Sequence, residues 1–239
     1  MNSSFISKYK PAIILTLALA VFLVSSKLPG KSWVVSTFAG SGEWGYHDAT
    51  GTAAQFNLPT GVAVDSSDNV YVADEENNRI RKITPEGEVS TFAGDGTKGY
   101  KDGTNEEAQF NYPYGVALDS SGSVYVADKG NHRIRKITPE GEVSTLAGDG
   151  TKAEFNYPGD IAVDSFGNLY VTDTSNHRIR KITPEGEVRT LAGGGQKGYK
   201  DAVGTKAEFR YPSGVAMDSD GILYVADADN YRIRKIEYK

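Results

Sequence analysis

The sequence contains no cysteine, and only three of its 239 residues are histidine. The absence of cysteine excludes disulfides, thiolate metal sites and cysteine nucleophiles, although it does not decide between a reducing and an oxidising compartment. Positive charge is also scarce, because 26 lysines and arginines stand against 31 aspartates and glutamates and give a formal net charge of -5. Binding along a nucleic-acid backbone needs a net or clustered positive field. The composition therefore predicts no nucleic-acid partner.

Long apolar runs are absent except near the N-terminus. Residues 12–24 are apolar apart from one threonine, and two lysines precede them without any acidic residue. This order is typical of a signal peptide, whose apolar region is shorter than the roughly 20 residues of a membrane-spanning helix. A second interpretation extends the hydrophobic helix to residues 9–28 and makes it an uncleaved anchor. Residues 1–31 are thus expected to be a signal peptide or a single anchor with a short linker, and either predicts an extracytoplasmic protein.

What the sequence has in abundance is a repeated unit. The segment 56–94 recurs at 110–148 and 155–193 and, shortened, at 209–239. Such a unit cannot bury its apolar faces alone and must stack on its neighbours. In each copy, four runs rich in β-branched and aromatic residues alternate with turn residues, as in a four-stranded antiparallel blade of an all-β propeller. In the first copy the predicted strands are 61–65, 70–74, 79–84 and 88–92. The glycine-containing first strand is expected to lie nearest the axis.

The most specific motif is Val-Tyr-Val-Ala-Asp followed by Asn-His-Arg-Ile-Arg-Lys-Ile, at residues 124–128 and 131–137. Through this motif the chain resembles the NHL repeat over residues 33–239. The resemblance implies a β-propeller and leaves the activity open. NHL propellers more often have six blades, so four copies depart from the family's usual pattern.

The two ends of the repeat array complement each other. The last copy lacks its fourth strand, whereas residues 33–40 match the segment 88–94 that carries this strand in the first copy. We expect this N-terminal strand to complete the last blade, so that residues 32–239 form a closed four-bladed propeller. The alternative is that the strand completes a blade in another chain and builds a larger ring.

Charged residues that recur in every copy are assigned to the fold. Each second strand ends in an aspartate, and an arginine follows five residues later, as Asp128 and Arg133 do in the second copy. We expect the two to form a structural pair across a loop. The Arg-X-Arg-Lys strands are expected to form a solvated belt that the Pro-Glu-Gly-Glu turns neutralise.

Function is expected where the copies differ. The loop that leads into each blade is long at 41–55, 95–109 and 194–208 and short at 149–154. Long loops on one face of a rigid scaffold are where binding residues concentrate. Asp160 replaces a glycine of the other copies, and we expect it to line an asymmetric groove beside the short loop. The alternative is that the loops only pack on themselves. The candidate partner-binding residues are Trp44, Tyr46, His47, Tyr100, Lys101, Asp160, Tyr199 and Lys200.

Catalytic chemistry is poorly represented. Gluconolactonase-like hydrolases and amidating lyases, which share the propeller architecture with six blades, hold a metal in the axial channel. Here the inner strands offer mainly valine, alanine, isoleucine, leucine and methionine. His132 and His177 occupy one repeat position and are weak zinc candidates, because catalytic zinc normally has three protein ligands. The Asp-rich loops are weak calcium candidates without EF-hand spacing. No cofactor is expected.

The sequence therefore predicts an exported, non-enzymatic binding or scaffold propeller. Its expected partner is a protein or a carbohydrate that contacts the loop-rich face, and an anchored form would suit an accessory subunit of a membrane complex. The alternative is a metal-dependent hydrolase or lyase acting at the mouth of the channel, with Asp160, His132 and His177 as the residues to test.

Overall fold

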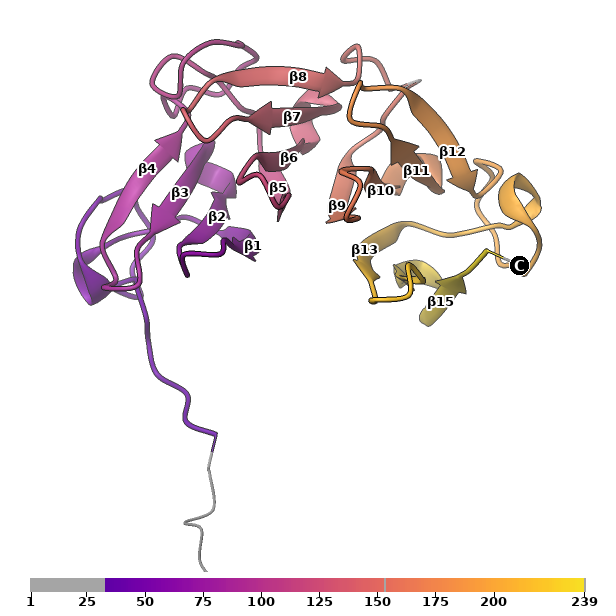
Figure 1. Cartoon of the computed structure of the whole chain (residues 1–239), viewed down its shortest axis with the longest axis horizontal. Coiled ribbons are helices and arrows are strands. Elements are labelled where there is room, and N and C mark those ends of the chain that lie inside the picture. The colour runs from indigo at the N-terminus through magenta and orange to yellow at the C-terminus, as the bar shows by residue number, and fades with distance from the viewer. Residues whose placement is uncertain (1–32, 153, 239) are drawn as a thin grey trace, which may run out of the picture. The chain divides into compact units, whose positions relative to one another are not determined.

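A computed structural model describes residues 33–152 and 154–238, and Thr37–Lys239 form one compact unit. The strands of this unit make four antiparallel sheets, the blades of a β-propeller, arranged along an arc (Figure 1). The predicted leader or anchor at residues 1–31 lies outside the described residues. Within the part of the chain that the structure describes, no helix is both long and apolar enough to cross a membrane.

The blades follow one another in chain order. The first contains β1 (Pro59–Val64), β2 (Val70–Asp74), β3 (Arg79–Ile83) and β4 (Val89–Ala93). The second contains β5 (Pro113–Leu118), β6 (Val124–Asp128), β7 (Arg133–Ile137) and β8 (Val143–Ala147). The third contains β9 (Pro158–Val163), β10 (Leu169–Asp173), β11 (Arg178–Ile182) and β12 (Val188–Ala192). The fourth contains β13 (Pro212–Met217), β14 (Leu223–Asp227) and β15 (Arg232–Ile236). The four predicted strands of the first copy are confirmed, with small differences at their ends.

Short 3₁₀ turns join or precede the strands. Those between the second and third strands are η2 (Glu75–Asn77), η3 (Lys129–Asn131), η4 (Thr174–Asn176) and η6 (Ala228–Asn230). Those in the loops that lead into a blade are η1 (Gly51–Ala53) and η5 (Gly204–Lys206). Every blade therefore presents the same kind of turn at the same end.

The innermost strands β1, β5, β9 and β13 face the middle of the arc and pack on one another (Figure 1). Their backbones approach so closely that glycine is needed. A Cβ atom on Gly61 would lie 2.3 Å from the carbonyl oxygen of Tyr114, and one on Gly115 would lie 2.4 Å from that of Gly159. The prediction that the glycine-containing strand lies nearest the axis is confirmed.

The apolar core lies between neighbouring blades. Phe110, Phe155 and Phe209 begin corresponding segments of three blades and are buried, and the cluster around Phe110 includes Tyr71 and Ile80 of the preceding blade. Burying one such ring stabilises the fold by roughly 1.5–3 kcal/mol. The blades thus stabilise one another across their faces, as stacked repeats do.

The predicted closing strand at residues 33–40 is not formed. These residues contain no strand, and the sheet β13–β15 has three strands. Ala39 packs against the apolar cluster of the first blade, and the N–H of Gly40 donates to the carbonyl of Gly51 at 3.0 Å. The arc of blades is open between the first and last blades (Figure 1), and Ala39 and Gly40 lie against the first. The prediction of a closed four-bladed ring is therefore wrong for this structure, and pairing with another chain stays a prediction.

The repeated aspartate pairs with a different arginine from the one predicted. Asp128 lies 2.9 Å from Arg135, and both side chains are completely buried. Arg133, directly opposite Asp128 in the strand register, instead donates to the carbonyls of Asn131 and Asp149. The prediction of a solvated arginine belt is likewise wrong for Arg135, because its guanidinium lies under the loop that leads into its blade.

The buried aspartate also fixes the start of the innermost strand. Asp128 accepts hydrogen bonds from the N–H of Asn111 and from the side-chain amide of Asn131, each at 2.8 Å. The other blades repeat these contacts through Asp74, Asp173 and Asp227. In every blade, one carboxylate at the end of the second strand therefore binds both the turn that follows it and the residues that lead into the innermost strand.

Candidate functional site

The long loops dock on their own blades. In the second blade the Tyr100 ring stacks 3.8 Å from the guanidinium carbon of Arg133, and its hydroxyl lies 3.1 Å from Oγ1 of Thr145. Tyr46 and Tyr199 stack in the same way on the corresponding arginines, at 3.9 and 4.0 Å. The tyrosine hydroxyls form hydrogen bonds within their own blades. This agrees with the alternative prediction that the loops only pack on themselves.

His47, Lys101 and Lys200 use their backbones in this docking. Their carbonyls accept hydrogen bonds of 3.2, 2.9 and 3.0 Å from the buried arginines. The Nδ1 atom of His47 lies 3.1 Å from the carbonyl of Ala53, and Lys101 lies 3.7 Å from Glu107. Both lysine side chains remain exposed, so their role in partner binding stays a prediction.

Asp160 links the third blade to the fourth. Its two carboxylate oxygens accept the N–H groups of Ile161 and Val215, at 2.9 and 3.0 Å. Burial raises the pKa of this carboxyl above its usual value, and the two hydrogen bonds oppose that shift. Asp160 lies in the innermost strand, whereas the long loops cover the outer strands of their blades. The structure therefore does not bring Asp160 and the gap of the short loop together in one groove.

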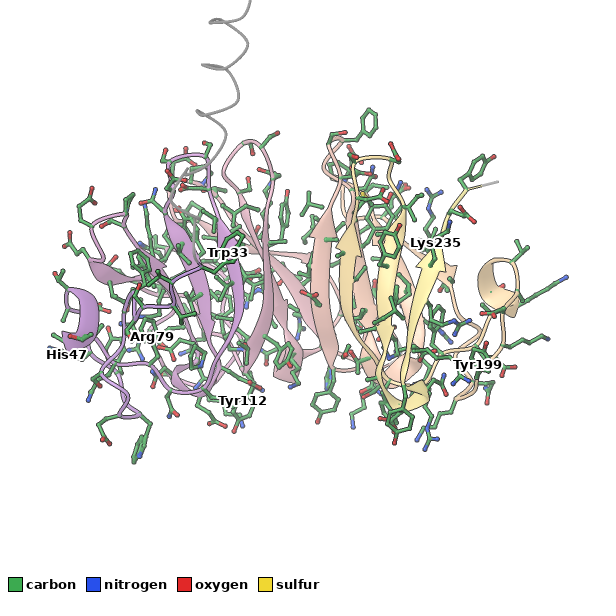
Figure 2. All side chains as sticks on the ribbon, turned by 90° about the horizontal axis from the view of Figure 1, so that it is seen from below. Trp33, His47, Arg79, Tyr112, Tyr199 and Lys235 are labelled. Atoms are coloured by element: carbon green, nitrogen blue, oxygen red, sulfur yellow. The ribbon has the colours of Figure 1, made fainter. Side chains whose placement is uncertain are left out.

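Four residues at one repeat position combine large side chains with an uncommon backbone conformation. They stand directly before the repeat proline and have left-handed backbones with φ between 50° and 56°; they are Leu58, Tyr112, Tyr157 and Tyr211. Bulky residues rarely adopt this conformation, and such strain clusters at binding and catalytic sites. We call this surface the tyrosine face, and Figure 2 shows Tyr112 at the lower end of the blades.

Cations accompany the rings of the tyrosine face. The ammonium groups of Lys98 and Lys197 lie 4.1 and 4.6 Å from the rings of Tyr112 and Tyr211. Trp44 occupies the repeat position of these lysines, because its bridge to Phe56 corresponds to theirs with later phenylalanines. Its side chain is 80% exposed. The predicted contact residue Trp44 therefore adjoins the tyrosine face at the first blade.

A shallow hollow of about 240 Å³ lies between two of the tyrosines. Tyr112 and Tyr157 line it together with Glu75, Glu76 and Lys129. Lys129 is held 3.3 Å from Glu75. Aromatic rings beside fixed charges can contact both the apolar and the polar parts of a ligand.

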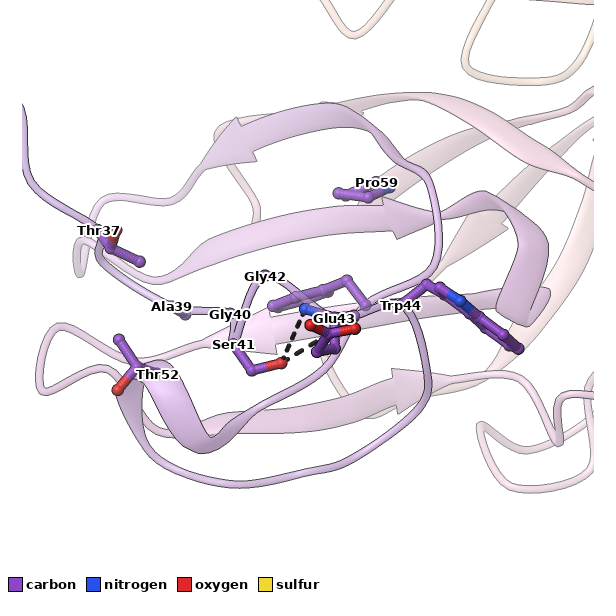
Figure 3. A pocket seen from close by; sticks show the side chains of 10 residues that line it. Thr37, Ala39, Gly40, Ser41, Gly42, Glu43, Trp44, Thr52 and Pro59 are labelled. Atoms are coloured by element: carbon purple, nitrogen blue, oxygen red, sulfur yellow. Dashed lines mark hydrogen bonds between the residues drawn. The ribbon is translucent and has the colours of Figure 1, made fainter.

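A second hollow, of about 560 Å³, lies against the first blade (Figure 3). Phe56 lines it and is only half-buried, whereas the corresponding phenylalanines of later blades are covered by the preceding blade. Trp44 also lines this hollow (Figure 3). The hollow therefore corresponds to the space that a preceding blade fills elsewhere in the array.

His132 and His177 act as links between blades. Each Nδ1 accepts the N–H of a strained tyrosine of the next blade, Tyr157 at 3.1 Å and Tyr211 at 3.2 Å. The rings also make edge-to-face contacts with these tyrosines, at 4.8 and 4.7 Å. Within the described residues, no three histidine, cysteine, aspartate or glutamate side chains lie together as metal ligands. Zinc binding by these two histidines stays a prediction, and the structure shows one ring nitrogen of each engaged in a link between blades.

We expect these two links to weaken in acid. Burial lowers the pKa of both histidines below the ordinary value of 6.5. Between that value and the lower folded-state pKa the unfolded chain binds more protons, so stability is full above pH 6.5 and falls as the pH drops. Asn78 makes the same link to Tyr112 at 3.1 Å without titrating.

The double variant His132→Asn and His177→Asn should therefore keep the links and lose less stability than the wild type between about pH 7.5 and 5.5. Urea unfolding at several pH values measures this difference. Equal losses in the two proteins would contradict the assigned role of the histidines.

The tyrosine face was not among the predicted sites. Its residues recur in the repeat, and residues that recur from copy to copy are expected to serve the fold. The available signal was a tyrosine directly before the repeat proline in three of the four copies. The left-handed backbone that presents the rings depends on side-chain acceptors from the preceding blade, and no single copy contains that information.

Comparison with known proteins identifies the repeat. The family model described as NHL repeat matches residues 56–83, 110–137, 155–182 and 209–236. Human NHL repeat-containing protein 2 is 42% identical over 95 residues, which are 39% of this chain and 13% of that protein. Protein SUPPRESSOR OF QUENCHING 1 of Arabidopsis thaliana is 35% identical over 96 residues, which are 40% of this chain and 9% of that protein. The chain thus spans only a small part of these relatives.

Solved structures share the fold at lower identity. An auxiliary nutrient binding protein from Bacteroides thetaiotaomicron has a TM-score of 0.61 at 19% identity, covering 78% of this chain and 49% of that one. A gluconolactonase from Xanthomonas campestris has a TM-score of 0.58 at 18% identity, covering 81% and 60%. Such likeness shows a fold that serves both binding and catalysis. With its four matched repeats and its bladed structure, the chain belongs to the NHL-repeat β-propeller proteins.

Proposed function

We propose that this protein is an exported, non-enzymatic binding module that contacts a protein or carbohydrate partner through the tyrosine face. The observation that carries the proposal is the set of residues with strained backbones before the repeat prolines, which are exposed or half-buried and of which three are tyrosines. Asparagine or glycine would adopt this backbone with less strain than a tyrosine or a leucine does. A binding surface gains rigid aromatic contacts.

The surroundings of the rings suit a polar partner. Lys98, Lys197 and the ion pair of Lys129 with Glu75 supply charge close to the aromatic surface. Sugars present apolar faces and hydroxyl groups together, and so do many protein surfaces. The solved nutrient-binding relative supports a binding role for a propeller of this kind.

Export rests on the sequence of residues 1–31, with two lysines followed by a short apolar run. A cleaved signal peptide releases the propeller, whereas a retained anchor at residues 9–28 makes it an accessory subunit of a membrane complex. The intact mass of the mature protein distinguishes these forms.

The double variant Tyr112→Asn and Tyr157→Asn tests the binding surface. Two aromatic anchors each contribute more than about 1 kcal/mol to a typical interface, so partner affinity should fall at least about tenfold. The probes are a panel of soluble polysaccharides and the envelope fraction of the source organism, applied to wild type and variant in parallel.

The matched control is Phe166→Asn. Phe166 is 82% exposed in the turn between the first and second strands of its blade, away from the residues that precede the repeat proline. The Phe166→Asn variant should bind every partner that the wild-type protein binds. A tyrosine variant that also keeps them all would contradict the proposal.

The catalytic alternative is a metal-dependent hydrolase or lyase, and similarity of fold to a gluconolactonase supports it. Metal analysis of the purified full chain tests it. Tightly held metal that is lost in the variant Asp160→Asn would favour the enzyme, because Asp160 carries the inner-strand carboxylate facing the next blade.

A further inference from the structure

Three blades carry a Tyr-X-Asp segment that docks on a pair of arginines. In the second blade the Tyr100 ring covers Arg133, and Asp102 lies 2.6 Å from Nη2 of Arg135. The hydroxyl of Thr145 donates to the same aspartate at 3.2 Å. The first and fourth blades repeat the segment at residues 46–48 and 199–201. The fold thus defines a receptor for an aromatic ring followed two residues later by a carboxylate.

The third blade has the receptor without the segment. Its repeat proline follows the previous one by 45 residues instead of 54, and the shortened loop contains neither tyrosine nor aspartate at the docking positions. The receptor residues Arg178, Arg180 and Thr190 are nevertheless present. Among the described residues, no aromatic ring lies over Arg178 and no carboxylate faces Nη2 of Arg180.

Arg180 makes the same kind of Nη1 contacts as Arg135 makes in the second blade. Its Nη1 lies 3.1 Å from Asp173 and also donates to the carbonyl of Glu154. The side chain is 9% exposed, whereas that of Arg135 is completely covered. A guanidinium that is nine-tenths buried and lacks its second carboxylate gains strongly from an incoming anion, because charge-assisted hydrogen bonds are strong where water is excluded.

The outer edge of the third blade is open as well. In the second blade the loop pairs with the edge strand, since the N–H of Val143 donates to the carbonyl of Gly103 at 2.8 Å and the carbonyl of Val143 accepts from the N–H of Gly103 at 3.0 Å. In the third blade the described residues supply no such partner to Val188, which is half-buried where Val143 is buried. An exposed strand edge is a template for pairing with an extended peptide.

We propose that the third blade binds an extended peptide of aromatic–X–acidic sequence from a partner protein. The peptide adds to the edge of β12 and sets its aromatic ring on Arg178 and its carboxylate on Nη2 of Arg180 and on Thr190. The ligand class follows from the molecule itself, which holds such segments in its other three blades. The site uses none of the residues of the tyrosine face and does not rest on the function proposed for that face.

A labelled peptide with the sequence of residues 98–104, Lys-Gly-Tyr-Lys-Asp-Gly-Thr, is the probe. Fluorescence anisotropy during titration with the full chain should report saturable binding at one site. Replacing the aspartate of the peptide by asparagine should weaken binding at least about tenfold, since a hydrogen bond to a charged group contributes roughly 1.5–3 kcal/mol. Replacing its tyrosine by alanine should weaken binding about threefold, as expected for an exposed cation–π contact.

Two variants of the chain locate the site. Insertion of residues 99–107 after Lys152 restores the missing loop. In this variant the inserted Tyr-X-Asp segment should occupy the receptor, and the added peptide should no longer bind. Arg178→Ala should weaken binding about threefold. The control Arg189→Ala removes the same charge from an exposed position of the same edge strand and should change nothing.

Three results would overturn the proposal. These are absence of binding at about 0.5 mM protein, equal affinity for the aspartate and asparagine peptides, and unchanged binding to the variant with the restored loop. None of them bears on the tyrosine face, whose variants are tested with other probes.

Discussion

Replacing Asp128 by alanine should lower the free energy of unfolding by about 3–5 kcal/mol, the usual cost of removing one partner of a buried ion pair. The carboxylate is completely buried and accepts three hydrogen bonds, from Asn111, Asn131 and Arg135. Its loss leaves a buried guanidinium and two buried N–H donors without their partner. Urea unfolding of the full chain, followed by circular dichroism, measures the effect.

The control for Asp128→Ala is Glu140→Ala. Glu140 lies exposed in the turn between β7 and β8 of the same blade, so its removal should change the stability by less than about 0.5 kcal/mol. Similar losses in the two variants would show that the buried aspartate does not organise the blade.

Gly115→Ala should destabilise the protein by about 1–3 kcal/mol, as overpacking of a tight interior does. The added Cβ would lie 2.4 Å from the carbonyl oxygen of Gly159 and 2.8 Å from the Cα of Asp160, and both are backbone atoms of the next blade. The innermost strands β5 and β9 must then move apart. Urea unfolding again gives the loss.

The last blade supplies a matched control at the same repeat position. A Cβ on Gly214 would meet only side-chain atoms, at 3.6 Å from Ala226 and 3.8 Å from Asp160, which are ordinary contacts. Gly214→Ala should therefore leave the stability within about 0.5 kcal/mol or raise it slightly, because alanine restricts the unfolded chain. Equal effects at the two glycines would contradict the close approach of the inner strands.

The blades themselves could be predicted because their signals are local. Alternating β-branched and aromatic residues with turn residues between them define strands such as β6 (Val124–Asp128) within a single copy. The small residue in each innermost strand also points to a crowded axis, since only glycine permits the approach seen at Gly115.

Pairing and closure depended on geometry that the sequence does not contain. Two arginines follow each aspartate on one strand, and Arg135 pairs with Asp128 whereas the guanidinium of Arg133 binds backbone carbonyls. The match of residues 33–40 to a fourth strand suggested a closed ring. The packing of successive innermost strands fixes the curvature instead, and four blades leave the arc open (Figure 1).

The candidate site could be predicted only in part. Trp44, one of the two tryptophans, is a predicted contact because aromatic residues often anchor interfaces, and the structure places it exposed beside the tyrosine face. The sequence does not single out Tyr112 and Tyr157 as binding residues, because a residue that recurs in the repeat can be explained by the fold as well as by function. Their positive φ and the acceptors that hold them, Asn78 and His132, belong to the contact between blades.

The most direct test of a binding role for the tyrosine face is the free energy of unfolding of the variant Tyr112→Asn and Tyr157→Asn. Asparagine tolerates the left-handed backbone of both positions, so relief of strain offsets the lost ring contacts. We predict a stability within about 1 kcal/mol of the wild type, together with the loss of partner binding described above. A fall of more than about 2 kcal/mol would show that the tyrosines are present for the fold and would contradict the account.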